Sequence, residues 1–350
     1  MTASFSIRGR LVGPGEPAYV VAELSGNHGH RYDDAVGLVR AAKGAGADAV
    51  KLQTYTPDTI TIDSERLEFV VAEGSPWSGR RLYELYGEAS MPWDWQPKLK
   101  AIADDLGIHL FSTPFDFTAV DFLEAMDVPV YKIASLELVD LPLIQRVART
   151  GKPVIMSTGA STLAEIEEAV SAFRAAGDQA LALLKCTSAY PAPLGEMNLA
   201  TIPDLAATFG VPVGLSDHSL GLSVPVAAVA LGACIVEKHL TLSRSVPTPD
   251  SAFSLEPGEF RAMVEAIREA ENARGDVSYE ITEHEAASRT FRRSLYVVES
   301  VRAGEPLTQD NVRSIRPGNG LPPKHLDEVV GRRASRDIEA GTPLSWDLLS

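Results

Sequence analysis

The chain has 350 residues, 45% of them hydrophobic, which is enough for one large barrel of about 250 residues and a smaller second domain. Its 47 acidic residues outnumber its 32 Lys and Arg residues, and the net charge of −15 disfavours nucleic acid and anionic membranes as partners. The two cysteines, Cys186 and Cys234, fall in predicted buried strands without metal-binding spacing, so we expect a reduced, cytoplasmic protein without disulfides.

Eight short apolar runs lie along the first 240 residues, with helical patterns between them. Runs dominated by Val, Ile and Leu are typical of parallel strands buried on both faces. Eight alternations of strand and helix predict a closed (β/α)8, or TIM, barrel. The predicted strands are residues 19–23, 49–53, 109–113, 130–135, 154–157, 182–187, 213–218 and 234–239.

The segments between the strands carry recognisable helix ends. Thr162 and Glu165 form a capping box, which predicts a helix that begins there and ends at Gly177. The most apolar stretch, residues 220–236, is interrupted by Ser, Pro and Gly residues. We therefore interpret it as a helix followed by a strand, and not as a membrane span.

Polar residues stand at or just after the end of each predicted strand. In a (β/α)8 barrel the C-terminal strand ends meet at one rim, where residues far apart in sequence contact one ligand. This arrangement predicts an active site at the rim. The residues expected there are Glu23, Lys51, Gln53, Thr113, Lys132, Ser135, Glu137, Ser157, Ser188, Tyr190, Ser216, Asp217, His218, Glu237 and His239.

The first predicted strand ends in an unusually dense polar motif. Residues 23–28, Glu-Leu-Ser-Gly-Asn-His, place a carboxylate, an amide and an imidazole within six positions. This density favours a functional role over a structural turn, although His28 alone could cap the following helix.

A long segment separates Gln53 from the helix expected near Asp94. It includes residues 75–80, Ser-Pro-Trp-Ser-Gly-Arg, and Tyr83. Loops of this length inside a barrel are usually functional, so we predict a lid over the active site.

Lys51 and Lys132 end the second and fourth predicted strands, where a structural strand would continue with apolar residues. Buried lysines are rare unless they are paired, and together with neighbouring hydroxyl groups they predict a cradle for phosphate. A second interpretation stays open, a Schiff-base lysine as in barrel aldolases, because a desolvated amine is nucleophilic near neutral pH. The hydroxyl residues of the cradle are Thr113, Ser135, Ser157 and Ser216.

His218 and His239 end the seventh and eighth predicted strands, which are neighbours in a closed barrel. Their imidazoles can converge on one cation at about 2.1 Å. A lone histidine is more often structural, but a pair at matching strand ends, flanked by Asp217 and Glu237, favours a metal site. With two histidines and no thiolate, an exchangeable ion such as Mn²⁺ or Mg²⁺ suits the site better than structural Zn²⁺.

The composition changes after a helix expected at residues 256–274, and a strand-like run at 294–298 opens a second domain. We place the boundary near 276–290, with domains at 1–280 and 281–350. Residues 301–307, Val-Arg-Ala-Gly-Glu-Pro-Leu, recur as residues 338–344, Ile-Glu-Ala-Gly-Thr-Pro-Leu. This duplication predicts a compact β-rich domain with internal pseudo-symmetry.

An arginine stands in a turn-forming segment between the two copies of the repeat. The segment is residues 316–320, Arg-Pro-Gly-Asn-Gly. Taken alone, it is typical of an ordinary surface turn.

Several segments, in this order along the chain, resemble the sialic acid synthase family. Each segment alone is a weak signal, but the ordered set spans nearly the whole chain. The branch that the chain most resembles is the pseudaminic acid synthases, through residues 23–28, 79–83 and 250–254. The segments that carry the family resemblance are 23–28, 51–54 (Lys-Leu-Gln-Thr), 112–115 (Ser-Thr-Pro-Phe), 131–135 (Tyr-Lys-Ile-Ala-Ser), 186–191 (Cys-Thr-Ser-Ala-Tyr-Pro), 214–218 (Gly-Leu-Ser-Asp-His) and 316–320.

The resemblance implies a TIM barrel followed by an antifreeze-like (SAF) domain. It implies a transferase that condenses phosphoenolpyruvate with a 2,4-diacetamido-trideoxy hexose, giving pseudaminic acid and phosphate through C–O cleavage. The alternative is an N-acetylneuraminate or legionaminate synthase with the same chemistry. Ser188, and Gly29-His30 after His28, depart from the pattern of sialic acid synthases proper, which disfavours N-acetylmannosamine as the sugar.

The resemblance also implies roles for the rim residues. Glu23, His218 and His239 would be catalytic, and the two histidines would hold the divalent metal. The residues expected to bind phosphoenolpyruvate are Lys51, Thr113, Lys132, Ser135, Ser157, Ser188 and Ser216. The residues expected to bind the sugar are Gln53, Glu137, Tyr190, Asp250 and Arg316. Arg316 would reach into a partner subunit's barrel, which implies a domain-swapped homodimer.

Two rival functions come from other classes. A Schiff-base aldolase would use the same barrel, but the pair His218 and His239 weighs against it. A non-catalytic glycan-binding protein would need no carboxylate, lysines and paired histidines at one rim, so the rim disfavours that interpretation too.

Overall fold

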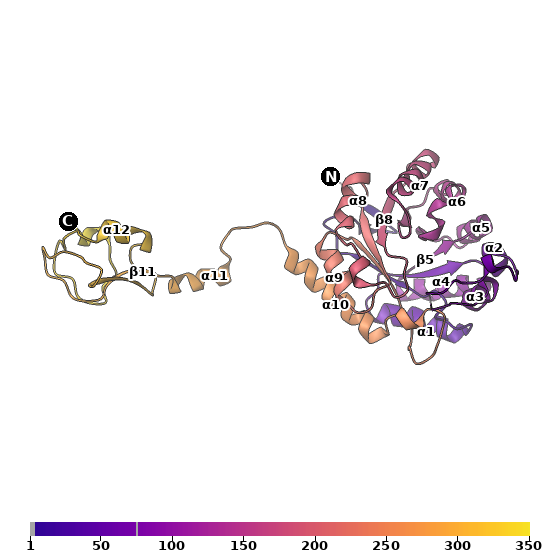
Figure 1. Ribbon diagram of the computed structural model, residues 1–350, viewed down its shortest axis with the longest axis horizontal. Coiled ribbons are helices and arrows are strands. Elements are labelled where there is room, and N and C mark those ends of the chain that lie inside the picture. Colours follow the sequence, from indigo (N-terminus) through magenta and orange to yellow (C-terminus); the bar gives the residue numbers. More distant parts are fainter. Residues whose placement is uncertain (1–3, 75) are drawn as a thin grey trace. The chain divides into compact units, whose positions relative to one another are not determined.

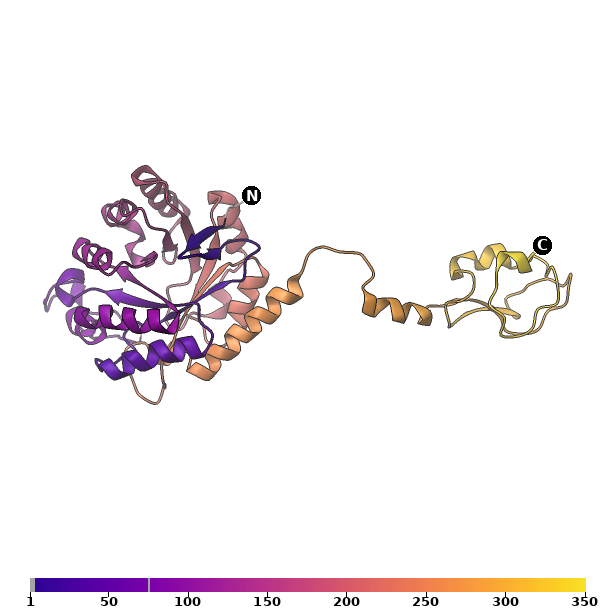
Figure 2. The same cartoon turned by 180° about the vertical axis from the view of Figure 1, so that it is seen from behind.

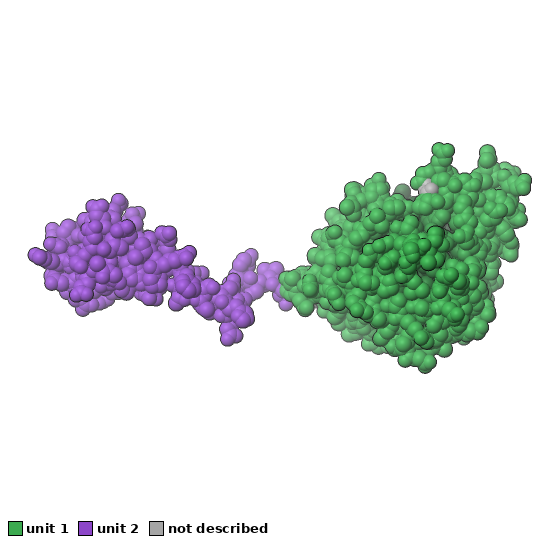
Figure 3. All heavy atoms as spheres, turned by 90° about the horizontal axis from the view of Figure 1, so that it is seen from below, with its two compact units in different colours: residues 1–275 green, residues 276–350 purple. Residues whose placement is uncertain are grey.

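The computed structural model describes residues 4–74 and 76–350. It divides into two compact units, residues 1–275 and 276–350, which are coloured separately in Figure 3. Within the described residues, no helix combines the length and apolar character needed to cross a membrane. Each unit has its own hydrophobic core, so each is described by itself.

The first unit is a closed barrel of eight parallel strands, surrounded by helices (Figure 1). The strands run around the barrel in the order β10-β3-β4-β5-β6-β7-β8-β9, so that the last strand closes against the first. All eight predicted strands are confirmed, with ends within two residues of those observed. The strands are β3 Tyr19–Glu23, β4 Ala49–Thr54, β5 His109–Pro114, β6 Tyr131–Ile133, β7 Val154–Ser157, β8 Leu181–Cys186, β9 Val213–Asp217 and β10 Ile235–His239.

The helices bury one face against the strands. The predicted capping box of α7 is confirmed: Thr162 Oγ1 accepts from the Glu165 N–H at 3.3 Å, and Glu165 Oε2 accepts from the Thr162 N–H at 2.7 Å. Helix α7 ends directly before Gly177, as predicted. The surrounding helices are α1 Tyr32–Gly44, α4 Gln96–Leu106, α5 Phe117–Ala125, α6 Leu141–Ala148, α7 Leu163–Ala176, α8 Thr201–Phe209, α9 Ser223–Ala230 and α10 Pro257–Arg274.

A short hairpin precedes the barrel strands and was not predicted. Strands β1 Phe5–Ile7 and β2 Arg10–Val12 pair antiparallel through a turn at Arg8 and Gly9, which both have positive φ (Figure 2). Ile7 and Val12 are fully buried in the barrel core. Because β2 leads into the start of β3, the hairpin lies at the end of the barrel opposite the C-terminal strand ends. Three-residue strands are too short for a recognisable alternation.

The segment between β4 and α4 is partly helical. We call residues 55–95 the lid segment. A bridge between Val70 and Arg81 folds its centre into a hairpin. Ser75, part of the predicted lid motif, lies outside the described residues. The elements of the lid segment are α2 Pro57–Ile60, η1 Leu67–Phe69, α3 Leu82–Ala89 and η2 Trp93–Trp95.

The second unit contains the predicted pseudo-symmetry. Val301 and Ile338, the first residues of the two repeat copies, exchange backbone hydrogen bonds of 2.9 and 2.8 Å. The bridge of Tyr296 to Pro343 has its counterpart in the bridge of Arg333 to Pro306. The repeat thus forms an internally two-fold fold. Its elements are α11 Glu283–Ser288, η6 Arg289–Phe291, β11 Ser294–Val297, β12 Val312–Ile315, η7 Pro323–His325, α12 Leu326–Val329 and η8 Trp346–Leu348.

The loop that carries Arg316 is fixed to β11. The Ser294 hydroxyl donates to the Pro317 carbonyl at 2.7 Å and accepts from the Gly320 N–H at 2.9 Å. A Cβ at Gly320 would lie 2.4 Å from the Leu295 carbonyl oxygen, so this position requires glycine. Arg316 itself is exposed at the start of this anchored loop.

Candidate active site

A cavity of about 440 Å³ opens at the C-terminal ends of the barrel strands. Its lining brings together residues from β3, β4, β6, β7, β9 and β10 and from the loops that follow the strands. Most of the predicted rim residues therefore share one cavity, as the barrel geometry predicts. The predicted residues that line it are Glu23, Lys51, Gln53, Lys132, Ser135, Glu137, Ser157, Ser188, Tyr190, Ser216, His218, Glu237, His239 and Asp250.

Two buried carboxylates flank one lysine at the floor of this cavity. Lys51 Nζ lies 2.8 Å from Glu23 Oε2 and 3.2 Å from Glu237 Oε1. Gln53 donates to Glu23 Oε1 at 2.9 Å, and Ser216 donates to Glu237 Oε1 at 3.3 Å. The strand register brings these groups together, because Glu23 lies opposite Lys51, and Glu237 lies opposite Ser216, on neighbouring strands.

Burial and neighbouring charges shift the pKa values of the two carboxylates in opposite directions. Burial raises the pKa of Glu23, and the pull of Lys51 only partly offsets it. Burial also acts on Glu237, but Lys132 and Lys51 together outweigh it and hold the pKa of Glu237 below its ordinary value. Glu23 is thus the carboxylate better suited to accept a proton during a reaction.

Lys132 is a buried cation that contacts no carboxylate among the residues the structure describes. Its Nζ donates to Ser157 Oγ at 2.6 Å and to the Ile133 carbonyl at 2.9 Å, both neutral acceptors. Burial lowers the pKa of Lys132 to about 8, and Lys51 adds to this effect while Glu237 opposes it. A bound anion would supply the charge that this lysine lacks.

Two hydroxyl groups of the cavity lining lie close to the backbone of Gly159. Ser135 Oγ accepts from the Gly159 N–H at 3.1 Å. A Cβ at Gly159 would lie 2.3 Å from Ser188 Oγ and 2.8 Å from Ser135 Oγ. A larger residue would therefore displace these two hydroxyl groups, which line the cavity and can donate to a small anion there.

The two histidines lie side by side with their ring centroids 5.4 Å apart. His218 Nδ1 lies 3.1 Å from the Thr187 carbonyl, which can only accept, so Nδ1 carries the proton and Nε2 of the neutral ring keeps its lone pair. His239 Nδ1 lies 3.1 Å from Ser25 Oγ, whose hydroxyl bonds to Asp250. These outer partners orient both rings as they do for metal-ligating histidines.

The donor set fits a divalent metal that takes its other ligands from water or substrate. Burial lowers the pKa of His239 well below its usual value, which keeps the ring neutral and able to ligate. Burial alone would lower the pKa of His218. The contacts of His218 with Cys186 and the Thr187 carbonyl outweigh burial, so the pKa of His218 lies above its ordinary value. Across residues 4–74 and 76–350, no group of three or more His, Cys, Asp or Glu side chains is arranged to hold a metal. A metal held here would therefore rely on His218 and His239 and on ligands from water or substrate.

Aromatic rings join the histidines to the lid segment. Tyr190 stacks on His218 at 4.3 Å between ring centroids, and Trp77 lies 5.4 Å from Tyr190. The Trp77 indole N–H donates to the Pro249 carbonyl at 2.9 Å. Tyr190 was predicted at the rim, whereas Trp77 was expected only as part of the lid.

Three residues predicted for the site do not line the cavity. Thr113 is fully buried behind Lys51, with 3.5 Å between Thr113 Oγ1 and Lys51 Nζ. Asp217 instead pairs with the buried Lys238. Arg316 belongs to the second unit.

The Asn27 and His28 side chains of the first motif stabilise the loop after β3. Asn27 Nδ2 donates to the Leu240 carbonyl at 2.9 Å and to Ser254 Oγ at 2.8 Å. His28 Nδ1 accepts from the His30 N–H at 3.0 Å, and its ring packs edge-on against Trp95. The motif holds the loop after β3 in place, while Glu23 and Ser25 serve the cavity.

Sequence reasoning missed the aromatic and apolar residues that line the cavity. These side chains come from the lid segment and from the end of β5, where no periodic pattern marks a cavity wall. Polar residues at strand ends are recognisable in the sequence as candidates for a site, whereas apolar residues in a long loop are not. The unpredicted lining residues include Tyr55, Ile60, Val71, Trp77, Leu82, Leu85, Tyr86 and Phe115.

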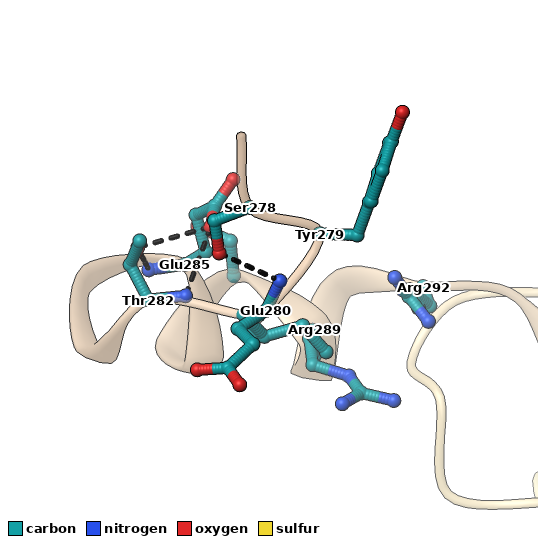
Figure 4. Close-up of a pocket in the computed structure, with 9 residues that line it drawn as sticks. Ser278, Tyr279, Glu280, Thr282, Glu285, Arg289 and Arg292 are labelled. Carbon is teal, nitrogen blue, oxygen red and sulfur yellow. Dashed lines mark hydrogen bonds between the residues drawn. The ribbon is translucent and has the colours of Figure 1, made fainter. Parts of the chain in front are cut away.

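A second hollow, of about 590 Å³, lies in the second unit between residues 278 and 292 (Figure 4). Its walls are exposed, and Tyr279 points away from the other side chains. Thr282 and Glu285 form a helix capping box there. The hollow contains no buried charged group, so it offers no chemistry comparable to the barrel cavity.

Fold and site together define a (β/α)8-barrel enzyme with a small C-terminal domain. The model of the NeuB family matches residues 38–279, and the model of the SAF domain matches residues 292–350. The chain therefore belongs to the NeuB family, which confirms the resemblance seen in the sequence.

Individual relatives match over nearly the whole chain. A pseudaminic acid synthase of Campylobacter jejuni subsp. jejuni serotype O:23/36 (strain 81-176) is 44% identical over 93% of this chain and 95% of its own length. A pseudaminic acid synthase of Helicobacter pylori is 43% identical over 95% of this chain and 98% of its own length. Among solved structures, an N-acetylneuraminic acid synthetase from Leptospira borgpetersenii, in complex with citrate, superposes with a TM-score of 0.74. It is 30% identical, over 82% of this chain and 95% of that one.

Proposed function

We propose that this protein condenses phosphoenolpyruvate with a 2,4-diacetamido-2,4,6-trideoxy hexose to give pseudaminic acid and inorganic phosphate. One observation carries the proposal: the barrel cavity joins two lysines, four carboxyl side chains and two histidines in a chain 43–44% identical to proteins named pseudaminic acid synthases. The lysines suit an anionic three-carbon substrate, and the histidines suit a metal beside a sugar aldehyde.

The reaction forms one C–C bond and breaks one C–O bond. The enol carbon of phosphoenolpyruvate forms a bond to the sugar's aldehyde carbon, and the aldehyde oxygen takes up a proton to become a hydroxyl. Water adds to C2 of the former phosphoenolpyruvate. The C2–O bond to phosphate then breaks, its electron pair leaves with the phosphate, and the new C2 hydroxyl gives up its proton as the C2 carbonyl forms. Glu23 accepts the proton of the attacking water, since burial raises the pKa of its carboxyl.

The remaining residues bind and orient the two substrates. Lys51 and Lys132 neutralise the phosphate and carboxylate of phosphoenolpyruvate, assisted by nearby hydroxyls. His218 and His239 would hold Mn²⁺ or Mg²⁺, which supplies Lewis-acid polarisation of the aldehyde oxygen when bound. The hydroxyls assigned to phosphoenolpyruvate are Ser135, Ser157, Ser188 and Ser216, with Thr113 supporting Lys51. The residues assigned to the sugar are Gln53, Glu137, Tyr190 and Asp250.

A methyl group at Gly159 is expected to block the anion site. Because its Cβ would press on Ser188 and Ser135, Gly159→Ala should raise the KM for phosphoenolpyruvate at least about tenfold, as expected when a substrate-positioning contact is displaced. Gly195→Ala is the matched control, since nothing lies within 4 Å of a Cβ there. Steady-state kinetics of both variants check the assignment. An unchanged KM in Gly159→Ala would place the phosphate elsewhere.

Affinity for phosphoenolpyruvate should fall at alkaline pH. Lys132 binds the anion as an ammonium ion, and its pKa is lowered to about 8, so the charge is present below that pH and is lost as pH rises through it. The expected profile of kcat/KM for phosphoenolpyruvate declines above about pH 8, by up to about tenfold per pH unit. The Lys132→Met variant should bind phosphoenolpyruvate weakly, and its kcat/KM should not decline above about pH 8. If the variant kept the same alkaline limb, another group would be responsible.

We also propose a homodimer in which Arg316 completes the partner's site. Segments that directly follow the barrel strands expose large apolar side chains for a second subunit to cover, and the second unit exposes apolar side chains of its own. Those of the barrel segments include Phe117, Leu136, Val139, Leu163 and Leu194, and those of the second unit include Val277, Tyr279 and Phe291.

Mixing two inactive proteins tests the shared site. Arg316→Ala and Glu23→Ala proteins, combined under conditions of subunit exchange, should recover part of the activity because one site per mixed dimer is intact. Subunit exchange without recovery would place Arg316 at the site of its own chain.

A Schiff-base aldolase is the second candidate, favoured by the pKa of about 8 at Lys132, which makes part of this amine neutral near physiological pH. Borohydride treatment with pyruvate would trap a lysine adduct in an aldolase. The proposed synthase should give no adduct and should release phosphate.

Phosphate release with phosphoenolpyruvate and Mn²⁺ tests the proposed function directly. The sugar panel consists of 2,4-diacetamido-2,4,6-trideoxy-altrose, the mannose-configured 2,4-diacetamido isomer and N-acetylmannosamine. Turnover confined to the altrose sugar supports pseudaminic acid synthesis. Preference for another sugar points to a legionaminate or neuraminate synthase, and no turnover with any sugar rejects the condensation.

A further inference from the structure

The barrel cavity has two chemically different parts. Its floor, at the strand ends, consists of buried charged and hydroxyl groups such as Glu23, Lys51 and Lys132. The other part comes from the lid segment and is mainly apolar. We call this part the lid wall, and it consists of Ile60, Val71, Trp77, Leu82 and Leu85 together with the rings of Tyr55 and Tyr86.

Hydrogen bonds and ring contacts hold the lid wall in place. The Val71 N–H donates to the Arg80 carbonyl at 2.9 Å, and the Gly79 N–H donates to the Val71 carbonyl at 2.9 Å, which fixes the hairpin that carries Val71. The Trp77 indole is tied to the Pro249 carbonyl. Tyr55 packs edge-on against Phe115 and Tyr86, with ring centroids 5.0 and 5.8 Å apart.

The chemistry at the floor orients the sugar. The aldehyde carbon must meet the enol carbon of phosphoenolpyruvate, close to Glu23 and the two histidines. The opposite end of the sugar chain then lies at the mouth of the cavity. The aliphatic side chains of the lid wall, those of Ile60, Val71, Leu82 and Leu85, carry no hydrogen-bonding group. A hydroxyl group placed against them would therefore lose water without gaining a partner.

We propose that the lid wall receives the methyl group at C6 of the sugar and thereby selects 6-deoxy acetamido sugars over their 6-hydroxy counterparts. This inference rests on the proposed function and deepens it, because it assigns the selection to particular residues. A hydrophobic wall discriminates against an added hydroxyl only moderately, so we expect a preference of roughly 10- to 100-fold in kcat/KM.

A matched pair of substrates tests the inference. The pair is 2,4-diacetamido-2,4,6-trideoxy-altrose and the same sugar with a hydroxyl at C6, assayed with the full-length protein, Mn²⁺ and saturating phosphoenolpyruvate. Val71→Thr keeps the shape of the side chain and adds a hydroxyl to the lid wall. It should reduce the 6-deoxy preference several-fold, toward unity, and leave the KM for phosphoenolpyruvate unchanged. Ile60→Thr provides a second, independent probe of the same wall.

Leu67→Thr is the control, because Leu67 belongs to the same lid segment but is 85% exposed and lies outside the cavity lining. It should keep the wild-type preference. A wild-type preference near unity, or a preference that neither Val71→Thr nor Ile60→Thr alters while both variants melt like the wild type, would overturn the inference. Turnover of the trideoxy sugar in that case would leave the proposed function standing. Absence of turnover with both sugars would reject the proposed function and the inference together.

Discussion

Replacing Glu23 by glutamine is expected to lower kcat by about 10²- to 10⁴-fold, the usual contribution of a positioned general base. The amide keeps the shape of the side chain and a hydrogen bond with Gln53, but it cannot accept a proton from water. Because burial raises the pKa of Glu23, the wild-type rate should rise with pH as this carboxyl loses its proton. Glu23→Gln should lose that rise. Rapid-quench phosphate release measured across pH checks both expectations.

Binding measurements separate this chemical role from a structural one. Glu23→Gln removes one of the two carboxylates beside Lys51, but Glu237 still pairs with that lysine at 3.2 Å. Phosphoenolpyruvate should therefore bind with an affinity within about tenfold of the wild type, measured by calorimetry. A variant with near-normal kcat would exclude Glu23 as the base. A variant that loses binding instead of turnover would assign it to positioning.

The barrel and most of its rim could be predicted from the sequence because both follow from short-range patterns. A strand buried on both faces must be apolar throughout, so an ionisable residue at its end is conspicuous. Lys51, Lys132 and His239 stand out for this reason, and all three line the cavity. The closed barrel then places them together without any long-range information.

The direction in which a side chain points was harder to predict. Successive residues of a strand face opposite sides, and a shift of one position moves a side chain from the cavity to the surrounding helix layer. Asp217 and Ser216 adjoin in β9, yet Ser216 contacts Glu237 in the cavity and Asp217 pairs with Lys238. The lid wall was missed for another reason: its apolar residues meet only through tertiary folding.

The buried pair of Asp217 and Lys238 should be the most costly ion pair to break in the barrel. Both side chains are fully buried, and Lys238 also donates to the Ser219 carbonyl at 2.6 Å. Lys238→Met or Asp217→Leu alone leaves one buried charge without its partner, which should lower the free energy of unfolding by about 3–5 kcal/mol. The double variant removes both charges and should recover most of this loss, since apolar replacements of buried pairs are often neutral.

Urea unfolding of the full chain, followed by tryptophan fluorescence, measures this cycle. The signal comes mainly from the barrel, because Trp77, Trp93 and Trp95 belong to it. Lys98→Met is the control, since Lys98 pairs with Asp94 on the surface, with side chains 59% and 70% exposed, and such pairs contribute about 0–1 kcal/mol. Losses that simply add in the double variant would show that the two charges do not stabilise each other. A large coupling, by contrast, would show that each charge is tolerated between β9 and β10, the two strands that carry Ser216 and His239, only because the other charge is present.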